Sequence, residues 1–179
     1  ITCNHDKTWS NGINLEWLMA EGASRFDEFR RILEQVIYRL TMLNAPTVAC
    51  VNGNAYAGGA IILAGCDFRL MRQDRGRLCY PEVDIKIPFT DMMHDVIQCL
   101  GNQQLLKRMA LLGEKVTGQQ AFDQGIIDGV FPAETLQDTA LEYATLLATK
   151  DRATTSSKIS KSFCVYPTTV GLPVVPLEA

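Results

Sequence analysis

The segment Thr47–Ala64 constrains the fold of this chain more than any other. It opens with the β-prone residues Thr47–Val51, and Asn52-Gly53 ends that run. Small and apolar residues then fill Ala55–Ala64, which contains a glycine pair. This order predicts a buried strand, a tight turn and a short buried helix. Because the apolar run is too short to cross a bilayer, we expect a protein that is not transmembrane.

Strand-like and helix-like segments alternate along the rest of the chain, which is typical of α/β proteins. Apolar residues that recur every three or four positions, together with capping residues and glycine stops, mark the helices. The expected strands are 1–3, 67–71 and 78–80. The expected helices are 26–44, 91–112 and 135–148, and the second of these is interrupted at Gly101-Asn102. A further short helix is expected after Thr117, which would cap its N-terminus. The proline-containing tail from Tyr166 is expected to be irregular.

Composition narrows the class of protein. The chain has 179 residues, of which 47% are hydrophobic and 21% charged, enough for one globular domain with a substantial core. The net charge is −3 and no run of Lys or Arg forms a basic stripe, so we expect no nucleic-acid partner. The six cysteines are scattered without a CxxC pair. We expect them to be reduced, which favours an intracellular compartment over secretion.

Two glycine-containing loops are candidate anion-binding elements. Gly58-Gly59 stands immediately before an apolar helix, so backbone N–H groups of the helix N-terminus are free to hold an oxyanion. The alternative is that the pair only permits close helix packing. Gly12, in the loop 9–15, is likewise either part of a site or a turn glycine. Spacing alone does not separate these interpretations.

Glu82 is the most conspicuous carboxylate. It follows Pro81 and begins the apolar alternation of 83–87, which predicts an extended segment. Taken alone, such a residue is either a solvated strand end or a base in an apolar site. Among other ionisable residues, His94 is expected to be a surface or half-buried helix residue rather than a base, and Asp91 is expected in the first turn of that helix.

Four segments occur in a fixed order: WSNGINL at 9–15, ACVNGNAYAGGAIILAGCDFRLM at 49–71, LCYPEVDIKIPFT at 78–90 and LLGEKVTGQQAFDQGIIDGVF at 111–131. Together they resemble motifs of the crotonase (enoyl-CoA hydratase/isomerase) superfamily, and the third is similar to a stretch of its Δ3,Δ2-enoyl-CoA isomerase branch. The resemblance implies an α/β fold, a crotonase-like spiral of ββα units with a helical C-terminal part. Residues 1–132 would form a partial crotonase core, and 133–179 a C-terminal helical and irregular segment. The N-terminal strands of the family are missing from this chain.

The resemblance also implies roles for individual residues. The backbone N–H groups of Ile13 and Gly58 would form an oxyanion hole, and Glu82 would be the catalytic base. The substrate-binding positions would be Gly12, Asn14, Leu15, Gly59 and Ile61. Hydratases of the family use two glutamates, and Ile61 stands where the first is found. The implied activity is therefore a Δ3,Δ2-enoyl-CoA isomerase, which shifts a double bond from C3 to C2 of an acyl-CoA by a single-glutamate proton shuttle.

This implied activity carries further expectations. Apolar neighbours such as Ile61 and Ile85 should raise the pKa of Glu82 by desolvation. No metal or redox cofactor is implied, and coenzyme A enters as part of the substrate. The family resemblance also implies a homo- or hetero-trimer of crotonase-like subunits, and a mitochondrial or peroxisomal matrix, or a bacterial cytoplasm, as the compartment.

Two alternatives remain open at this stage. The chain is either an enzyme or a non-catalytic crotonase-like subunit with a structural role in a larger assembly. Within the enzyme class, a dienoyl-CoA isomerase would use a further carboxylate after the glutamate, and Asp91 stands at about that place. An open acyl-CoA-sized pocket between Gly58 and Glu82 would favour an enzyme.

Overall fold

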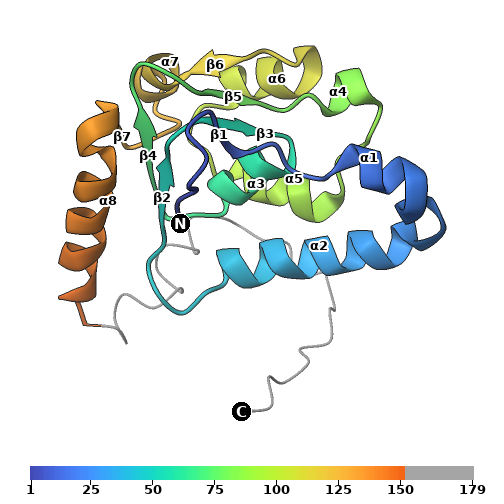
Figure 1. Ribbon diagram of the computed structural model, residues 1–179, viewed down its shortest axis with the longest axis horizontal. Helices are drawn as coiled ribbons and strands as arrows, with labels where there is room; N and C mark the ends of the chain where they lie inside the picture. The colour runs from blue at the N-terminus through green and yellow to red at the C-terminus, as the bar shows by residue number, and fades with distance from the viewer. Residues whose placement is uncertain (152–179) are drawn as a thin grey trace.

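In the computed structural model, which describes residues 1–151, the strands form two sheets (Figure 1). One sheet has the order β1-β3-β5-β6, formed by Thr8–Ser10, Asn54–Tyr56, Arg77–Cys79 and Val116–Thr117. The other has the order β2-β4-β7, formed by Val48–Val51, Phe68–Arg72 and Gly129–Phe131. Neighbouring strands are parallel except for β5 and β6, which are antiparallel.

The chain alternates between the two sheets as it advances. Strand β2 of one sheet leads to β3 of the other and then to helix α3 (Gly58–Ala64). The next turn repeats this order, because β4 and β5 are followed by α4 (Glu82–Ile85), α5 (Asp91–Gln98) and α6 (Gln103–Leu112). Successive turns run in the same direction, so equivalent strands pair in parallel. The predicted α/β spiral of ββα units is confirmed.

Strand β6 begins a last, altered turn. Helix α7 (Gly118–Asp123) follows it and leads into β7, so here the helix lies between the two strands. The predicted capping box is present, since the Thr117 hydroxyl accepts from the N–H of Gln120 while the Gln120 side chain accepts from the N–H of Thr117.

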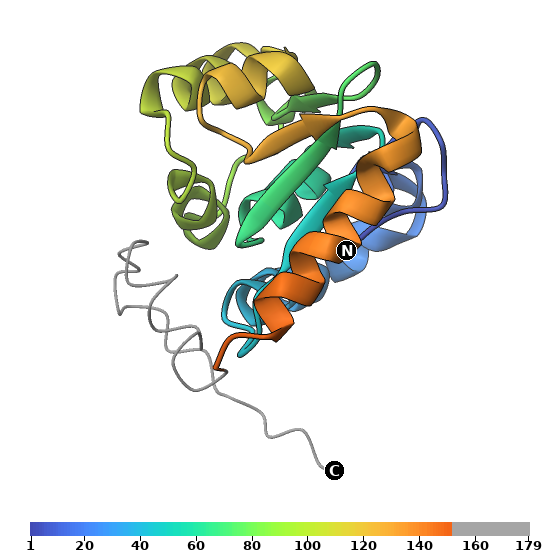
Figure 2. The ribbon, with the colours of Figure 1, turned by 90° about the vertical axis from the view of Figure 1, so that its left-hand side faces the viewer.

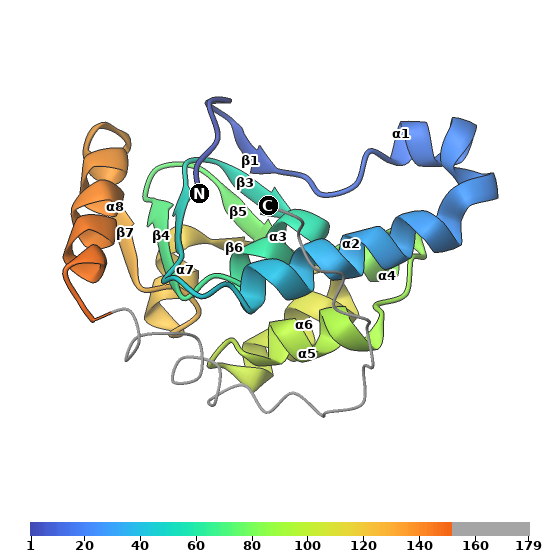
Figure 3. The same ribbon diagram turned by 90° about the horizontal axis from the view of Figure 1, so that it is seen from below.

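Helices cover both sides of the sheets. The long helix α2 (Phe26–Thr41) packs against α3 and α5, as Figure 3 shows, and buries Ile37. Helix α8 (Ala133–Ala148) lies across the outer face of the β2-β4-β7 sheet (Figure 2). A separate apolar cluster forms there, made of Val48, Cys50, Leu70, Leu136 and Ala140. Helices therefore shield the parallel sheet from solvent, as such sheets require.

Two predictions of local structure are wrong. Ile1–Cys3 does not form a strand, although the carbonyl of Ile1 accepts from the N–H of Cys50 at 2.8 Å. The segment predicted as extended from Glu82 begins instead with the one-turn helix α4, because the N–H groups of Asp84 and Ile85 both donate to the carbonyl of Pro81. An alternation of apolar residues over so few positions fits either structure.

The remaining elements lie between β1 and α2. A short helix α1 (Leu15–Trp17) continues into a turn of π-helix, Leu18–Gly22, and a 3-10 turn, Ala23–Arg25. No helix among residues 1–151 is long and apolar enough to span a membrane. The predicted irregular tail from Tyr166 lies outside the described residues.

The cysteines differ from the prediction at one position. Cys50, Cys66 and Cys79 are buried free thiols, and Cys3 is a partly exposed one. Cys99 is disulfide-bonded, so the expectation that all cysteines are reduced is wrong there. The sixth cysteine lies outside the described residues.

Candidate active site

Two glycines bring the loop after β1 against the start of α3. A Cβ atom added to Gly12 would stand 2.6 Å from the backbone nitrogen of Gly58. A Cβ atom added to Gly58 would stand 3.3 Å from the Cα of Gly12 and 3.9 Å from the nitrogen of Ile13. Gly12 also has a φ of +80°, which other residues rarely adopt. The structure therefore brings the predicted donors Ile13 and Gly58 together.

The turn into α3 is strained. Ala57 has a φ of 50° and a ψ of −128°, a conformation that costs a residue other than glycine about 1–3 kcal/mol. Its N–H donates to the carbonyl of Cys79 and its carbonyl accepts from the N–H of Ile61, so β5 and α3 hold the turn at both ends. Gly58 then begins the helix, where the first amides have no carbonyl within the helix to bond.

A cavity of about 650 Å³, including its open mouth, lies beside these loops. Its walls are mostly apolar and come from the loop after β1, from α2, α3 and α5, and from the segment that follows β5. The lining residues are Asn11, Ile13, Leu15, Leu33, Tyr56, Ala57, Gly58, Ile61, Pro81, Glu82, Ile85, Ile87, Pro88 and Met93.

Glu82 is the only charged residue among those lining residues. Helix α4 carries it into the interior, where it is 6% exposed and its Oε2 atom has no hydrogen-bond partner among the described residues. Burial raises the pKa of Glu82 to about 7, against the opposing effect of a backbone hydrogen bond. Ile61 and Ile85 line the same cavity, so the pKa shifts in the expected direction for the expected reason.

The other predicted substrate-binding positions divide into two groups. Leu15 and Ile61 line the cavity, whereas Gly12, Asn14 and Gly59 are not among its lining residues. The Asn14 side chain instead accepts from the N–H of Trp17 and caps α1. Gly59 packs against the backbone of β1, where any side chain would overlap the carbonyl of Ser10. Gly59 therefore permits close packing of α3 against β1, whereas Gly58 lines the cavity.

Several lining residues were not predicted from the sequence. Leu33 reaches the cavity from α2, Tyr56 from β3 and Met93 from α5. Leu33 lies on the apolar stripe of α2, a pattern that indicates burial but not a site. No local signal identifies Tyr56 or Met93, since only the packing of distant elements brings them to the cavity.

Asp91 and His94 lie elsewhere. Asp91 stands in the first turn of α5 as predicted, but it lines a separate surface hollow with Phe26 and Arg30 rather than the cavity of Glu82. His94 is exposed and shares a hydrogen bond with Gln98 on the same helix. Within residues 1–151, no group of three or more His, Cys, Asp or Glu side chains is placed to hold a metal ion.

Solved structures that share this spiral identify the fold class of the chain. An enoyl-CoA hydratase from Mycobacterium marinum matches with a TM-score of 0.77 and 23% identity, over 88% of this chain and 69% of that one. A protein from Mycobacterium tuberculosis, called an enoyl-CoA isomerase in one structure and a probable enoyl-CoA hydratase in another, matches in the first with a TM-score of 0.79 and 21% identity, over 89% of this chain and 68% of that one. The expected crotonase fold is thereby confirmed.

The chain belongs to the enoyl-CoA hydratase/isomerase family, whose model matches residues 1–164. Enoyl-CoA delta isomerase 3 of Arabidopsis thaliana is 34% identical over 132 residues, which are 72% of this chain and 56% of that protein. The peroxisomal enoyl-CoA delta isomerase 2 of the same plant is 33% identical, with the same coverage. The mitochondrial enoyl-CoA delta isomerase 1 of Homo sapiens is 26% identical over 79% of this chain and 47% of its own length. The chain thus spans about half the length of these relatives.

Proposed function

We propose that this chain is the catalytic core of an enoyl-CoA isomerase that moves a double bond from C3 to C2 of an acyl-CoA. One observation carries the proposal: Glu82, a buried carboxylate whose Oε2 atom has no hydrogen-bond partner among residues 1–151, lines the same apolar cavity as Ile13 and Gly58. A proton carrier and two backbone donors are the minimum that a double-bond shift next to a thioester needs. The names of the plant relatives are consistent with this reaction.

In the proposed reaction Glu82 takes a proton from C2 of a 3-enoyl thioester. The C–H electron pair enters the conjugated system, and the negative charge collects on the thioester oxygen. The amides of Ile13 and Gly58 would donate to that oxygen, each donor being worth about 10²- to 10³-fold in rate. Glu82 then returns the proton at C4, which leaves the double bond at C2 and the carboxylate as it began.

The environment of Glu82 suits a group that must both accept and donate a proton. A carboxyl with an ordinary pKa is a weak base at neutral pH, and burial raises the pKa of Glu82 to about 7. The shuttle requires neither a metal nor a redox cofactor, and coenzyme A is part of the substrate.

Ile61 distinguishes isomerisation from hydration. Hydration needs polar groups to hold and activate a water molecule, and Ile61 is a fully buried apolar residue on the wall of the cavity. A dienoyl-CoA isomerase would need a second carboxylate at the substrate, and Asp91 does not line this cavity. The single-glutamate isomerase is therefore the reaction that we favour.

The proposal extends to assembly and compartment. We expect a homo- or hetero-trimer of crotonase-like subunits, as the resemblance implies. We also expect a peroxisomal or mitochondrial matrix, the compartments that the names of two relatives give.

A direct comparison of two reactions tests the proposal. The full-length protein should isomerise a 3-enoyl-CoA far faster than it hydrates crotonyl-CoA, both followed spectrophotometrically. Hydration at an equal or higher rate would contradict the assignment, because Ile61 offers water no polar partner. If the protein shows neither activity and does not bind acyl-CoA, the structural-subunit alternative is correct.

A further inference from the structure

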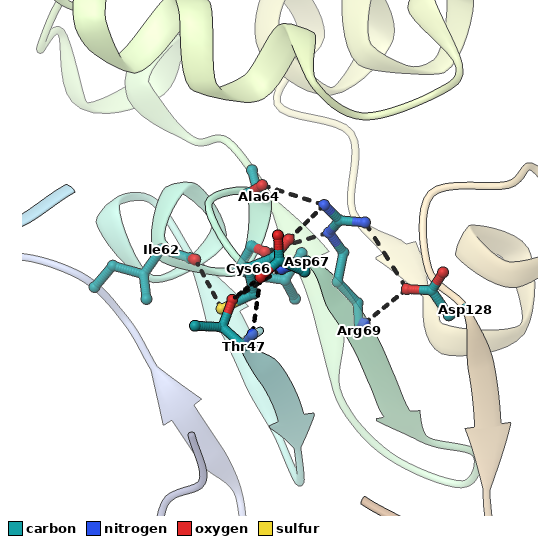
Figure 4. Close-up of polar contacts among 8 residues, drawn as sticks. Thr47, Ile62, Ala64, Cys66, Asp67, Arg69 and Asp128 are labelled. Atoms are coloured by element: carbon teal, nitrogen blue, oxygen red, sulfur yellow. Dashed lines mark hydrogen bonds and ion pairs between the residues drawn. The ribbon is translucent and has the colours of Figure 1, made fainter. Parts of the chain in front are cut away.

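Arg69 closes the C-terminal end of α3, opposite the end that faces the cavity. Figure 4 shows its guanidinium turned toward the helix end. Nε donates to the carbonyl of Leu63 at 3.3 Å, and Nη2 donates to the carbonyls of Ala64 at 3.3 Å and Cys66 at 2.6 Å. Leu63 and Ala64 belong to the last turn of α3, where the Leu63 carbonyl also accepts from the N–H of Cys66, and a cation is favourable at this end of the helix dipole.

Asp128 holds Arg69 from the other side. Its Oδ2 atom lies 3.8 Å from Nη1 of Arg69 and accepts from the Arg69 backbone N–H at 2.7 Å (Figure 4). The backbone N–H of Asp128 in turn donates to the carbonyl of Arg69 at 2.8 Å. The Arg69 side chain is only 14% exposed. A partly buried clamp therefore joins the end of α3 to β4 and to the segment that precedes β7.

The two ends of α3 are mechanically linked. The helix runs only from Gly58 to Ala64, a length of about 10 Å. Six of its seven residues are buried, so it moves as one packed unit rather than by bending. A shift or rotation at the Ala64 end is therefore transmitted to Gly58, which lies against Gly12 and Ile13 with little space between them.

We infer that Arg69 is a positioning residue that sets the place of the Gly58 amide by clamping the far end of α3. The inference rests on the proposed function, since it gives the clamp a role in oxyanion stabilisation. A misplacement of about 1 Å in such a site can cost about 10²-fold in rate. Substrate contacts distant from Gly58 do not depend on the clamp.

Three variants of the full-length protein test the clamp and one serves as a control. Arg69→Met removes charge and donors, Arg69→Lys keeps the charge without the planar fork, and Asp128→Asn keeps Arg69 but weakens its anchor. The control is Thr47→Val, in the same region. It removes the two hydrogen bonds that the Thr47 hydroxyl makes with Asp67, at 2.9 and 3.0 Å, and does not remove a hydrogen bond to a carbonyl of α3.

The Thr47→Val control keeps the hydrogen bond from the backbone N–H of Thr47 to Asp67, so it loses only the two hydrogen bonds of the hydroxyl. We expect Arg69→Met to lower kcat about 10- to 100-fold with KM within about 3-fold of wild type. Arg69→Lys and Asp128→Asn should fall between Arg69→Met and wild type. Thr47→Val should lower the thermal midpoint but leave kcat unchanged, with all rates measured well below that midpoint.

The position of the amide is measured separately, as the ¹H–¹⁵N resonance of Gly58 without substrate. It should shift in Arg69→Met and not in Thr47→Val. An unmoved resonance in a folded Arg69→Met variant overturns the inference, as does an equal shift in Thr47→Val or wild-type kcat in Arg69→Met. If Arg69→Met does not fold, the same criteria apply to Arg69→Lys. A wild-type protein without isomerase activity would refute the proposed function, while the resonance would still decide whether Arg69 places the amide.

Discussion

Glu82 and Glu114 are the same residue type beside neighbouring strands, yet they have opposite properties. Glu82 follows β5, lies buried and has an Oε2 atom without a hydrogen-bond partner among residues 1–151, and burial raises its pKa to about 7. Glu114 precedes β6 and is partly exposed, and it accepts from Arg108 at 2.7 and 2.9 Å. Those hydrogen bonds hold its pKa below the ordinary value.

The difference shows what makes a carboxylate useful as a base. Glu114 is stabilised in its charged form by Arg108, so it holds a proton less readily than an ordinary glutamate. Burial removes water from Glu82 and raises its pKa to about 7, so the carboxyl can exchange a proton near neutral pH. The surroundings of each side chain, rather than its chemistry, separate a surface ion pair from a candidate catalytic group.

The substitution Glu82→Gln tests this comparison most directly, because it keeps the volume of the side chain and removes the base. Isomerisation should fall by about 10²- to 10⁴-fold while acyl-CoA binding survives. The matched control is Asp84→Asn on the same short helix, because Asp84 is exposed and does not line the cavity. Steady-state kinetics of both variants would decide the matter. If Glu82→Gln retains activity, Glu82 is structural and another base must act.

Gly58→Val tests the proposed donors, which line the same cavity as the carboxylate. Even the first added carbon would stand 3.3 Å from the Cα of Gly12, and the branched side chain would separate the two loops. Loss of one donor should lower kcat by about 10²- to 10³-fold, with a smaller effect on stability. Gly58→Ala should be intermediate in a parallel kinetic and thermal-melting series. A fully active Gly58→Val variant would show that this amide is not a donor.

The raised pKa of Glu82 also predicts a pH-dependent effect on stability. Below about pH 4.5 the carboxyl is protonated in both states, and above about pH 7 the folded protein carries the full cost of a buried charge. This pKa difference corresponds to on the order of 3 kcal/mol. Glu82→Gln should therefore raise the free energy of unfolding by about that amount at pH 8 and by little at pH 4. Urea denaturation at the two pH values measures it, and an equal difference at both would exclude this origin.

The smallest effect is expected from Glu114→Gln. The pKa of Glu114 is lowered, so its contribution to stability is present above the ordinary pKa and is lost as the pH falls through the lowered value. Surface pairs contribute little and are screened by salt. The variant should show a slightly lower thermal midpoint at neutral pH and low salt, with unchanged kcat. A large fall in kcat would mean that this pair, too, shapes the site.

The sequence predicted the site residues that lie within recognisable motifs. Gly12, Gly58 and Glu82 were recognisable because their segments resemble motifs of the family, whereas spacing alone left their roles open. The helix α4 was missed, since four residues with alternating apolar side chains fit a strand as well as a helical turn. Asn14 was given a substrate-binding role, but its side chain caps α1.

Contacts between elements that are far apart in the chain could not be predicted from the sequence. Leu33, Tyr56 and Met93 meet at the cavity from three elements that are far apart in the chain. Arg69 carries no motif of its own, and its three carbonyl partners become visible only when α3 and β4 are placed together. Tertiary packing decides such positions, whereas local propensity does not.

The spiral has a consequence for how the protein reaches its folded state. Val48 of β2 pairs with Phe68 of β4, and Ala55 of β3 pairs with Leu78 of β5, so each turn closes over a short stretch of chain. Short loops cost little entropy to close, which favours assembly by adding one turn to the next. The lining residues Ile13, Gly58 and Glu82 come from successive turns of the chain, so the cavity exists only when neighbouring turns have stacked. An intact cavity therefore reports that these turns have stacked.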